Sequence, residues 1–201
     1  MPHRIRDTGT RTHRLPKSQR VLLLVDFINA LDFPGAEKLA GPALEAARAT
    51  AELKRRLRGE GVVAIYANDN FGAWQSDFHG LVNRCLALPG EPGEIARLLR
   101  PQEDDLTVLK PRHSAFYASP LELLLVEMEA RELVICGLAA DMCVQLTAAD
   151  AFLREFHTWV PADCTAAETA EAKDTALRYM GNVLKCDVRP STAPAPAPAA
   201  G

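Results

Sequence analysis

The chain has 201 residues, of which 48% are hydrophobic, and its formal net charge at pH 7 is −3. This length suits one domain with a sizeable core, and the weak negative charge points away from nucleic acid and anionic membranes as partners. The five cysteines include no CxxC pair, and the first apolar run, residues 21–25, is far too short to cross a membrane. We therefore expect reduced thiols and a cytoplasmic location.

The two ends of the chain differ in composition from the sequence between them. Residues 1–18 are polar and basic without apolar periodicity, and residues 190–201 are rich in alternating Pro and Ala. A basic run of this kind is usually a solvated arm, and Pro/Ala alternation favours polyproline II or disorder. We predict a flexible arm at 1–18, a single domain at 19–189 and a disordered tail at 190–201.

Strand-like and helical patterns alternate along the predicted domain. The apolar runs typical of buried strands are residues 20–26, 62–67, 106–109, 132–136 and 157–160, with a weaker sixth at 183–188. Helical patterns lie between them, over residues 36–59, 91–100, 120–130, 141–156 and 168–180. Apolar strands alternating with amphipathic helices indicate a parallel sheet covered on both faces. The predicted fold is Rossmann-like α/β, a three-layer α/β/α domain with an open, mostly parallel six-stranded sheet.

Three reactive side chains follow three of the predicted strands. Asp26 ends the first strand, Lys110 follows the third, and Cys143 follows the fourth at the start of a helix. Sites in open parallel sheets lie at the carboxyl ends of the strands. An ammonium group and a helix N-terminus lower the pKa of a thiol, and a carboxylate can take its proton.

Each of these residues also has an ordinary structural interpretation. An Asp at a strand end is commonly a cap, a loop Lys is commonly solvated, and a Cys in an Ala-rich helix is commonly a small buried apolar residue. Their joint placement at one sheet edge raises the weight of a catalytic interpretation. From the residues alone, the catalytic and structural interpretations are evenly balanced.

Three longer segments resemble the isochorismatase-like hydrolases, a group that includes nicotinamidases, carbamoylsarcosine amidohydrolases and ureidoacrylate hydrolases. The segments are VLLLVDFINA from residue 21, LKPRHSAFYASPLELLL from residue 109 and LVICGLAADMCVQLTAADAF from residue 133. They occur in the order and spacing of that family, and the similarity extends over residues 19–188. The resemblance implies the isochorismatase-like hydrolase fold.

The resemblance also implies a chemical role for each matching residue. Asp26 would be the general base, Lys110 the cation that favours the thiolate, and Cys143 the nucleophile. The peptide bond between Leu138 and Ala139 would be cis, and the N–H groups of Ala139 and Cys143 would form an oxyanion hole. The implied activity is hydrolysis of an amide, carbamoyl or ureido C–N bond of a small molecule through a thioester, by a homo-oligomer (dimer or tetramer).

Two other functions remain open on this scaffold. An isochorismatase-type enzyme cleaves a vinyl ether by acid chemistry and needs no thiol, so the presence of Cys143 counts against it. A non-catalytic binding protein would have no use for the complete set of Asp26, Lys110 and Cys143.

The segment after the second predicted strand departs from the metal-binding pattern of nicotinamidases, which is built on an Asp-x-His motif. Asp69 matches the Asp of that motif, but Phe71 stands at the position of the His. His79 is the nearby imidazole, and a tight site needs about three protein ligands. We expect no metal and no cofactor, although a weak site that includes Asp69, Asp77 or His79 stays open.

Several loop residues are candidates for substrate contact. Aromatic rings beyond strand ends can form the wall of a pocket, a cation can bind a carboxylate, and an amide near the first strand can reach the site. Loop packing, solvation and turn formation are the competing interpretations. The candidates are Asn29, Trp74, Phe78, Arg112, His113 and Phe116.

Overall fold

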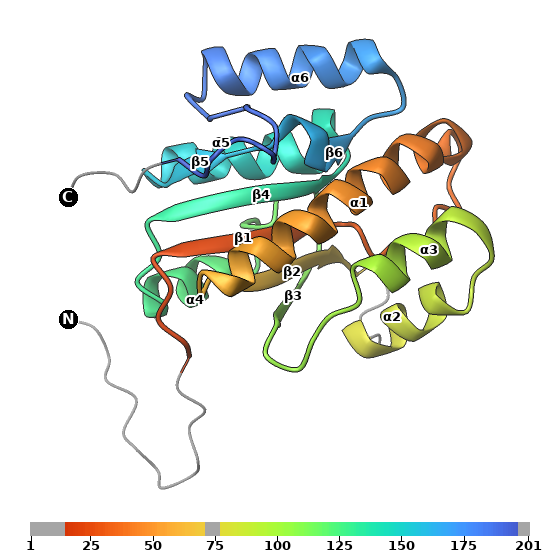
Figure 1. The fold of residues 1–201 in the computed structure, drawn as a ribbon, viewed down its shortest axis with the longest axis horizontal. Helices are drawn as coiled ribbons and strands as arrows, with labels where there is room; N and C mark the ends of the chain where they lie inside the picture. Colours follow the sequence, from red (N-terminus) through yellow and green to blue (C-terminus); the bar gives the residue numbers. More distant parts are fainter. Residues whose placement is uncertain (1–14, 71–76, 197–201) are drawn as a thin grey trace, which may run out of the picture.

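The structure, a computed structural model, describes residues 15–70 and 77–196 (Figure 1). Its centre is a sheet whose strand pairs are all parallel. The strand order is β3 (Leu106–Lys110), β2 (Val63–Asp69), β1 (Arg20–Val25), β4 (Glu132–Leu138) and β5 (His157–Trp159), and the short β6 (Thr165–Ala166) also pairs with β4. The predicted six-stranded α/β sheet is confirmed.

Helices cover both faces of this sheet (Figure 1). Side chains of β1 alternate between two cores: Leu22 and Leu24 pack on one side, and Leu23 and Val25 on the other. The first core is covered by α1 (Ala36–Gly59), α2 (Phe78–Leu86) and α3 (Gly90–Leu98). The second is covered by α4 (Leu121–Glu127), α5 (Gln145–Leu153) and α6 (Ala170–Asn182). Burial on both faces explains why the strands read as continuous apolar runs.

Two elements differ from the sequence-based prediction. The sequence does not predict α2, a nine-residue helix that begins after Asp77, whose carboxylate accepts a hydrogen bond from the Gly80 N–H at 2.6 Å. The predicted sixth strand at 183–188 is wrong, because only an isolated parallel bridge joins Trp159 to Asp187 there. The sixth strand of the sheet is the two-residue β6, which is too short to produce a recognisable pattern.

The first part of the predicted Pro/Ala tail is attached to the domain. The N–H and hydroxyl of Ser191 donate to the Asp163 carboxylate at 2.6 and 2.7 Å, and Arg56 donates to the Ser191 carbonyl at 2.6 Å.

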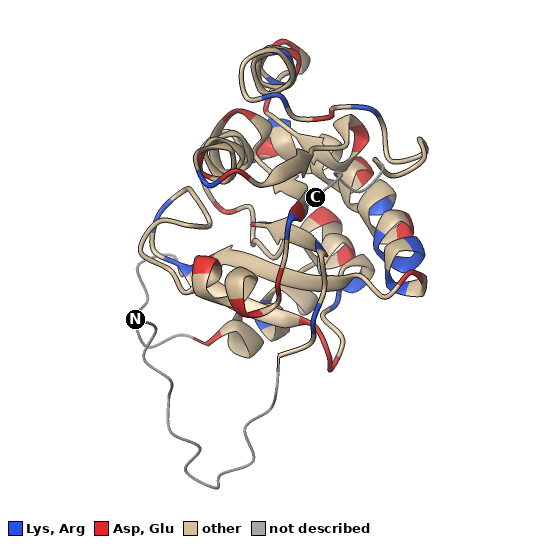
Figure 2. Ribbon diagram, turned by 90° about the vertical axis from the view of Figure 1, so that its left-hand side faces the viewer, with Lys and Arg blue, Asp and Glu red and all other residues tan. Residues whose placement is uncertain are grey.

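Basic and acidic residues are interspersed along the ribbon in the view of Figure 2. Within residues 15–70 and 77–196, no helix combines the length and hydrophobicity needed to cross a membrane.

Gly137 allows β4 to approach β1 closely near the carboxyl end of the sheet. It pairs with Val25 in the parallel register and has a φ of +155°. A Cβ atom at this position would lie 2.2 Å from the Val25 carbonyl oxygen, a distance that real Cβ atoms do not adopt. Any side chain here would therefore force the two strands apart.

Two neighbouring helices on one face expose large apolar side chains. Leu123 and Val126 on α4 are 62% and 66% exposed, and Leu153 on α5 is 75% exposed. An ion pair of 2.8 Å between Glu122 of α4 and Arg154, the residue after α5, links the two helices that expose these side chains. Exposed apolar surface of this kind commonly marks an interface, and a two-fold dimer matches the same patch with itself.

We propose that a second copy of the chain covers this surface and predict a homo-oligomer in solution. Light scattering at micromolar concentration should give at least twice the monomer mass of 21.9 kDa. The double variant Leu123→Glu/Val126→Glu should dissociate, because it places charges in an apolar contact. Val183→Glu, a change at another exposed apolar residue after α6, is the matched control. A wild-type mass near that of the monomer would contradict the prediction.

Candidate active site

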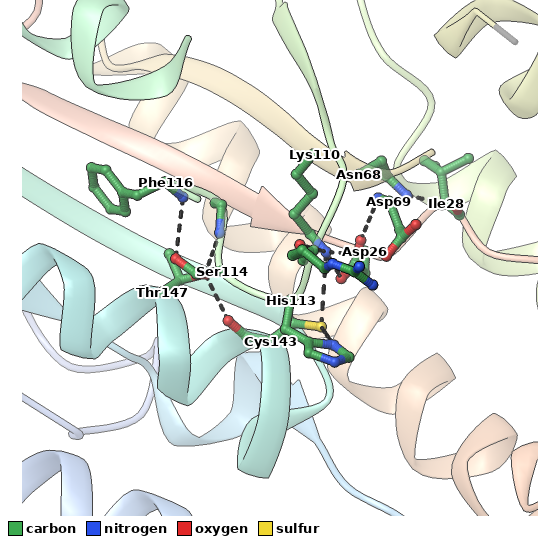
Figure 3. A network of polar contacts seen from close by, with 12 residues as sticks. Asp26, Ile28, Asn68, Asp69, Lys110, His113, Ser114, Phe116, Cys143 and Thr147 are labelled. Carbon is green, nitrogen blue, oxygen red and sulfur yellow. Dashed lines mark hydrogen bonds and ion pairs between the residues drawn. The ribbon is translucent and has the colours of Figure 1, made fainter. Parts of the chain in front are cut away.

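Three strand ends bring together the carboxylate, amine and thiol that the sequence identified (Figure 3). Asp26 directly follows β1, and Lys110 is the last residue of β3. Cys143 lies in η1 (Ala140–Val144), a π-helical turn between β4 and α5. The peptide bond between Leu138 and Ala139, which leads into this turn, is cis.

The ammonium group of Lys110 is at the centre of the cluster. Its Nζ atom lies 2.7 Å from Oδ2 of Asp26 and 3.8 Å from the Cys143 sulfur. The same atom donates to the Arg112 carbonyl at 3.1 Å and lies 3.8 Å from Oδ2 of Asp69. Lys110 is fully buried, so these groups replace the water that would otherwise surround its charge.

The backbone holds the Asp26 carboxylate in place. The φ angle of Asp26 is +53°, in the left-handed region, which Asp tolerates better than most residues. The Asp26 N–H donates to the Ala67 carbonyl at 3.1 Å, and Oδ1 accepts the Asp69 N–H at 2.7 Å. Because Oδ2 is paired with Lys110, both carboxylate oxygens have partners, and the side chain is 8% exposed.

Burial and the neighbouring charges set the protonation state of the thiol. Burial raises the pKa of the Asp26 carboxyl, against the opposing effect of Lys110. Burial, followed by the negative charge of Asp26, raises the pKa of the Cys143 thiol to about 12, although Lys110 acts to lower it. The sequence-based expectation that Lys110 favours the thiolate thus has the correct sign for that one interaction, but the larger effects of burial and of Asp26 keep the thiol neutral.

The loop after β3 is fastened to the helix that carries the thiol. Thr147 donates from its hydroxyl to the Cys143 carbonyl at 2.6 Å and accepts the Ala115 N–H at 3.0 Å. The Ser114 hydroxyl donates to Oδ2 of Asp150 at 2.6 Å. The sequence did not reveal Thr147 and Asp150 as parts of the site, because their role depends on contacts between two distant segments.

His113 is also beside the thiol. Its Nδ1 atom lies 3.8 Å from the Cys143 sulfur, and the residue is exposed. The sequence placed His113 only among candidate substrate contacts, and the structure shows that it approaches the Cys143 sulfur (Figure 3).

The remaining candidates for substrate contact have varied positions. Asn29 accepts the Leu31 N–H at 2.8 Å through its side chain, which supports the turn interpretation. Phe78 and Phe116 are buried, at 6% and 5% exposure, so their role as pocket walls finds no support in their contacts. Arg112 is exposed next to the site, and Trp74 lies outside the described residues.

The contacts of the two rings explain these positions. The Phe78 ring centroid lies 5.7 Å from that of Tyr66 in the core below α2. Phe116 packs against Phe156 at 6.1 Å between ring centroids, and the Arg154 guanidinium lies 4.8 Å from its ring. Both aromatic rings pack in the core of the domain.

The three residues considered for a weak metal site are all described by the structure. Asp69 contacts Lys110, Asp77 caps α2, and His79 is exposed on α2. Phe71 lies outside the described residues. In the part of the chain that the structure describes, no three His, Cys, Asp or Glu side chains lie together as ligands for one metal ion.

Comparisons with known proteins agree with this geometry. The isochorismatase domain model matches residues 20–187. The chain is 34% identical over 174 residues to the "Uncharacterized isochorismatase family protein YaaI" of Bacillus subtilis, covering 87% of this chain and 95% of that protein. It is 37% identical over 98 residues to the ureidoacrylate amidohydrolase RutB of Klebsiella pneumoniae, covering 48% of this chain and 42% of RutB.

A solved structure extends the agreement to the whole fold. The N-carbamoylsarcosine amidase from Thermoplasma acidophilum is 26% identical and superposes with a TM-score of 0.61, covering 89% of this chain and 99% of that one. Since the domain model spans nearly all of the sheet and its helices, the family does not depend on one local motif. The chain belongs to the isochorismatase family.

Proposed function

We propose that the protein is a cysteine hydrolase that cleaves the C–N bond of an amide, carbamoyl or ureido group in a small molecule, through a thioester on Cys143. The observation that carries this proposal is the cluster in which Lys110 Nζ lies 2.7 Å from Asp26 and 3.8 Å from the Cys143 sulfur. Relatives named as a ureidoacrylate amidohydrolase and an N-carbamoylsarcosine amidase support this bond type.

The first half of the reaction begins from the neutral thiol. Asp26 accepts the proton of Cys143 as the sulfur attacks the substrate carbonyl carbon, so charge moves only a short distance. Lys110 stabilises the negative charge that the sulfur gains during this step. The C–N bond then breaks, and the leaving nitrogen takes the proton from Asp26, which gives a neutral amine or ammonia and a thioester.

The negative charge on the substrate oxygen needs hydrogen-bond donors during the attack. We assign this role to the N–H groups of Ala139 and Cys143, at the start of the helical segment formed by η1 and α5. The amino-terminal end of a helix carries a partial positive charge that favours an oxyanion. In the second half, water attacks the thioester carbonyl, the C–S bond breaks, and the acid leaves with the thiol restored.

The competing functions leave parts of this cluster unexplained. A vinyl-ether hydrolase of isochorismatase type would give Cys143 no covalent role. A binding protein would give no reason to hold a fully buried ammonium group beside a thiol. A screen for ammonia release from nicotinamide, N-carbamoylsarcosine and ureidoacrylate separates the amidohydrolase from both alternatives.

With the best substrate from this screen, Cys143→Ala should lower kcat by roughly 10³-fold or more, because the covalent intermediate can no longer form. Circular dichroism should show an unchanged fold, since a methyl group replaces a small side chain that is only partly buried. Cys85→Ala, which removes a thiol from the core beneath α2, should keep most of the activity and is the control. A Cys143→Ala variant with substantial activity would rule out the thioester.

Two variants should shift the reactivity of Cys143 in opposite directions. Lys110→Met removes the charge that lowers the thiol pKa, so alkylation by iodoacetamide should need higher pH. Asp26→Asn removes the charge that raises it, so the midpoint of the alkylation profile should move to lower pH while turnover is lost. Mass spectrometry of the Cys143 peptide across pH measures both shifts. Identical profiles would show that neither group acts on the thiol.

We also propose that the reaction needs no metal ion, because the covalent steps use only Asp26, Lys110 and Cys143. Treatment with a strong chelator followed by gel filtration should leave kcat/KM for the best substrate within about twofold. Loss of activity that added zinc, manganese or iron restores would contradict this proposal.

A further inference from the structure

The mechanism above gives no role to His113, although its Nδ1 atom lies 3.8 Å from the Cys143 sulfur. This distance equals that from the sulfur to Lys110 Nζ. The two groups differ in environment, because Lys110 is fully buried and His113 is exposed. In Figure 3 the imidazole ring and Lys110 approach the sulfur from different directions. The thiol therefore has a buried ion pair on one side and a titratable ring on its open side.

The position of His113 is fixed by its neighbours on both sides. The Arg112 carbonyl accepts a hydrogen bond from Lys110 at 3.1 Å. The Ser114 hydroxyl donates to Asp150 at 2.6 Å, and Ser114 is buried. The backbone at residue 113 is thus held between the catalytic cluster and α5. Because the backbone is anchored on both sides, the exposed His113 side chain can occupy only a limited region, and the Cys143 sulfur lies at the edge of that region.

We propose that His113 is the general base that removes a proton from the water that hydrolyses the thioester. This inference rests on the proposed cysteine-hydrolase function. An acyl group on the sulfur extends toward the open side, since Lys110 and Asp26 fill the buried side. Water reaches the carbonyl carbon from the same open side. A neutral imidazole next to the sulfur is within reach of that water, directly or through one more water molecule.

The carboxylate of Asp26 is less suited to this step. Its Oδ1 accepts the Asp69 N–H at 2.7 Å, and its Oδ2 is paired with Lys110 at 2.7 Å. The side chain is 8% exposed, on the buried side of the sulfur. These contacts suit proton exchange with the thiol and with a leaving group that is still in place. A group on the open side of the sulfur is therefore better placed than Asp26 to take a proton from the entering water.

The proton and electron balance of the step is complete with one water molecule. The water oxygen bonds to the thioester carbonyl carbon while Nδ1 of His113 takes one of its protons. The tetrahedral intermediate then collapses, the C–S bond breaks, and the departing sulfur takes the proton from the imidazolium. The products are the free acid and the neutral Cys143 thiol, and the imidazole returns to its starting form.

The test separates formation of the acyl-enzyme from its hydrolysis, with 4-nitrophenyl acetate as the probe. Stopped-flow absorbance measures an initial burst of nitrophenolate from acetylation of Cys143 and then a steady state limited by deacetylation. For His113→Phe, the burst should stay within about twofold of wild type, while the steady-state rate falls roughly 10²-fold. Mass spectrometry should show acetyl-Cys143 accumulating in the variant.

The control is His157→Phe, which removes another exposed histidine. His157 begins β5 and pairs with Glu132 at the amino end of the sheet, away from the carboxyl-end site. This variant should show the same burst and the same steady-state rate as the wild type. His113→Asn, with added imidazole to restore deacetylation, provides a second variant if the Phe substitution disturbs folding.

A pH profile distinguishes proton transfer from a structural role. The charged and titratable groups near the imidazole are Arg112 on its own loop and Asp26, Asp69, Lys110 and Cys143 from the other elements of the site. If the imidazole takes the proton from water, the deacetylation rate of His113→Phe should depend on pH differently from that of the wild type. The burst, which depends on Asp26 and Cys143, should keep its own pH dependence in the variant.

Three results would overturn the inference, and they are distinguishable. An unchanged deacetylation rate in His113→Phe would show that the ring takes no part. Equal losses in the burst and the steady state, with no rescue by imidazole, would assign it a structural role. Absence of acetyl-Cys143 in the wild-type protein would instead refute the thioester, and with it the proposed function.

Discussion

The buried ion pair between Lys110 and Asp26 is the interaction on which the rest of the site depends. Removing two charges from water is expensive, by several kcal/mol for each ion, so the surrounding groups must compensate. The 2.7 Å contact, the Arg112 carbonyl and the Asp69 N–H provide this compensation. These groups lie at or just beyond the ends of three adjacent strands, so the sheet must be correctly assembled before the pair is stable.

Burial and, after it, the Asp26 carboxylate keep the Cys143 thiol neutral by raising its pKa. The effect of the carboxylate outweighs that of the Lys110 ammonium group, which acts to lower the pKa. Thiolates are the form that oxidants and electrophiles attack, so a protonated Cys143 is less exposed to side reactions. In the proposed mechanism, the proton moves to Asp26 as the sulfur bonds to a substrate carbonyl carbon, so the thiol would become reactive only when a substrate is bound.

The sequence predicts most of the sheet and the three central residues of the site. Buried parallel strands produce long apolar runs, and Asp26, Lys110 and Cys143 follow such runs at a common edge. The features that were missed depend on contacts between distant segments. The fastening of Ser114 to Asp150 and the approach of His113 to the sulfur arise from how the loop after β3 packs against α5. No local pattern encodes such packing.

Gly137 shows how the fold controls a distance inside the site. It pairs with Val25, the residue immediately before Asp26, and it precedes the turn that carries Cys143. A single added carbon at residue 137 would lie 2.2 Å from the Val25 carbonyl oxygen. Relief of that clash would separate the two strands that carry the carboxylate and the thiol. The absence of a side chain at residue 137 therefore helps to keep the Asp26 carboxylate and the Cys143 thiol at the short separation that the proposed proton transfer needs.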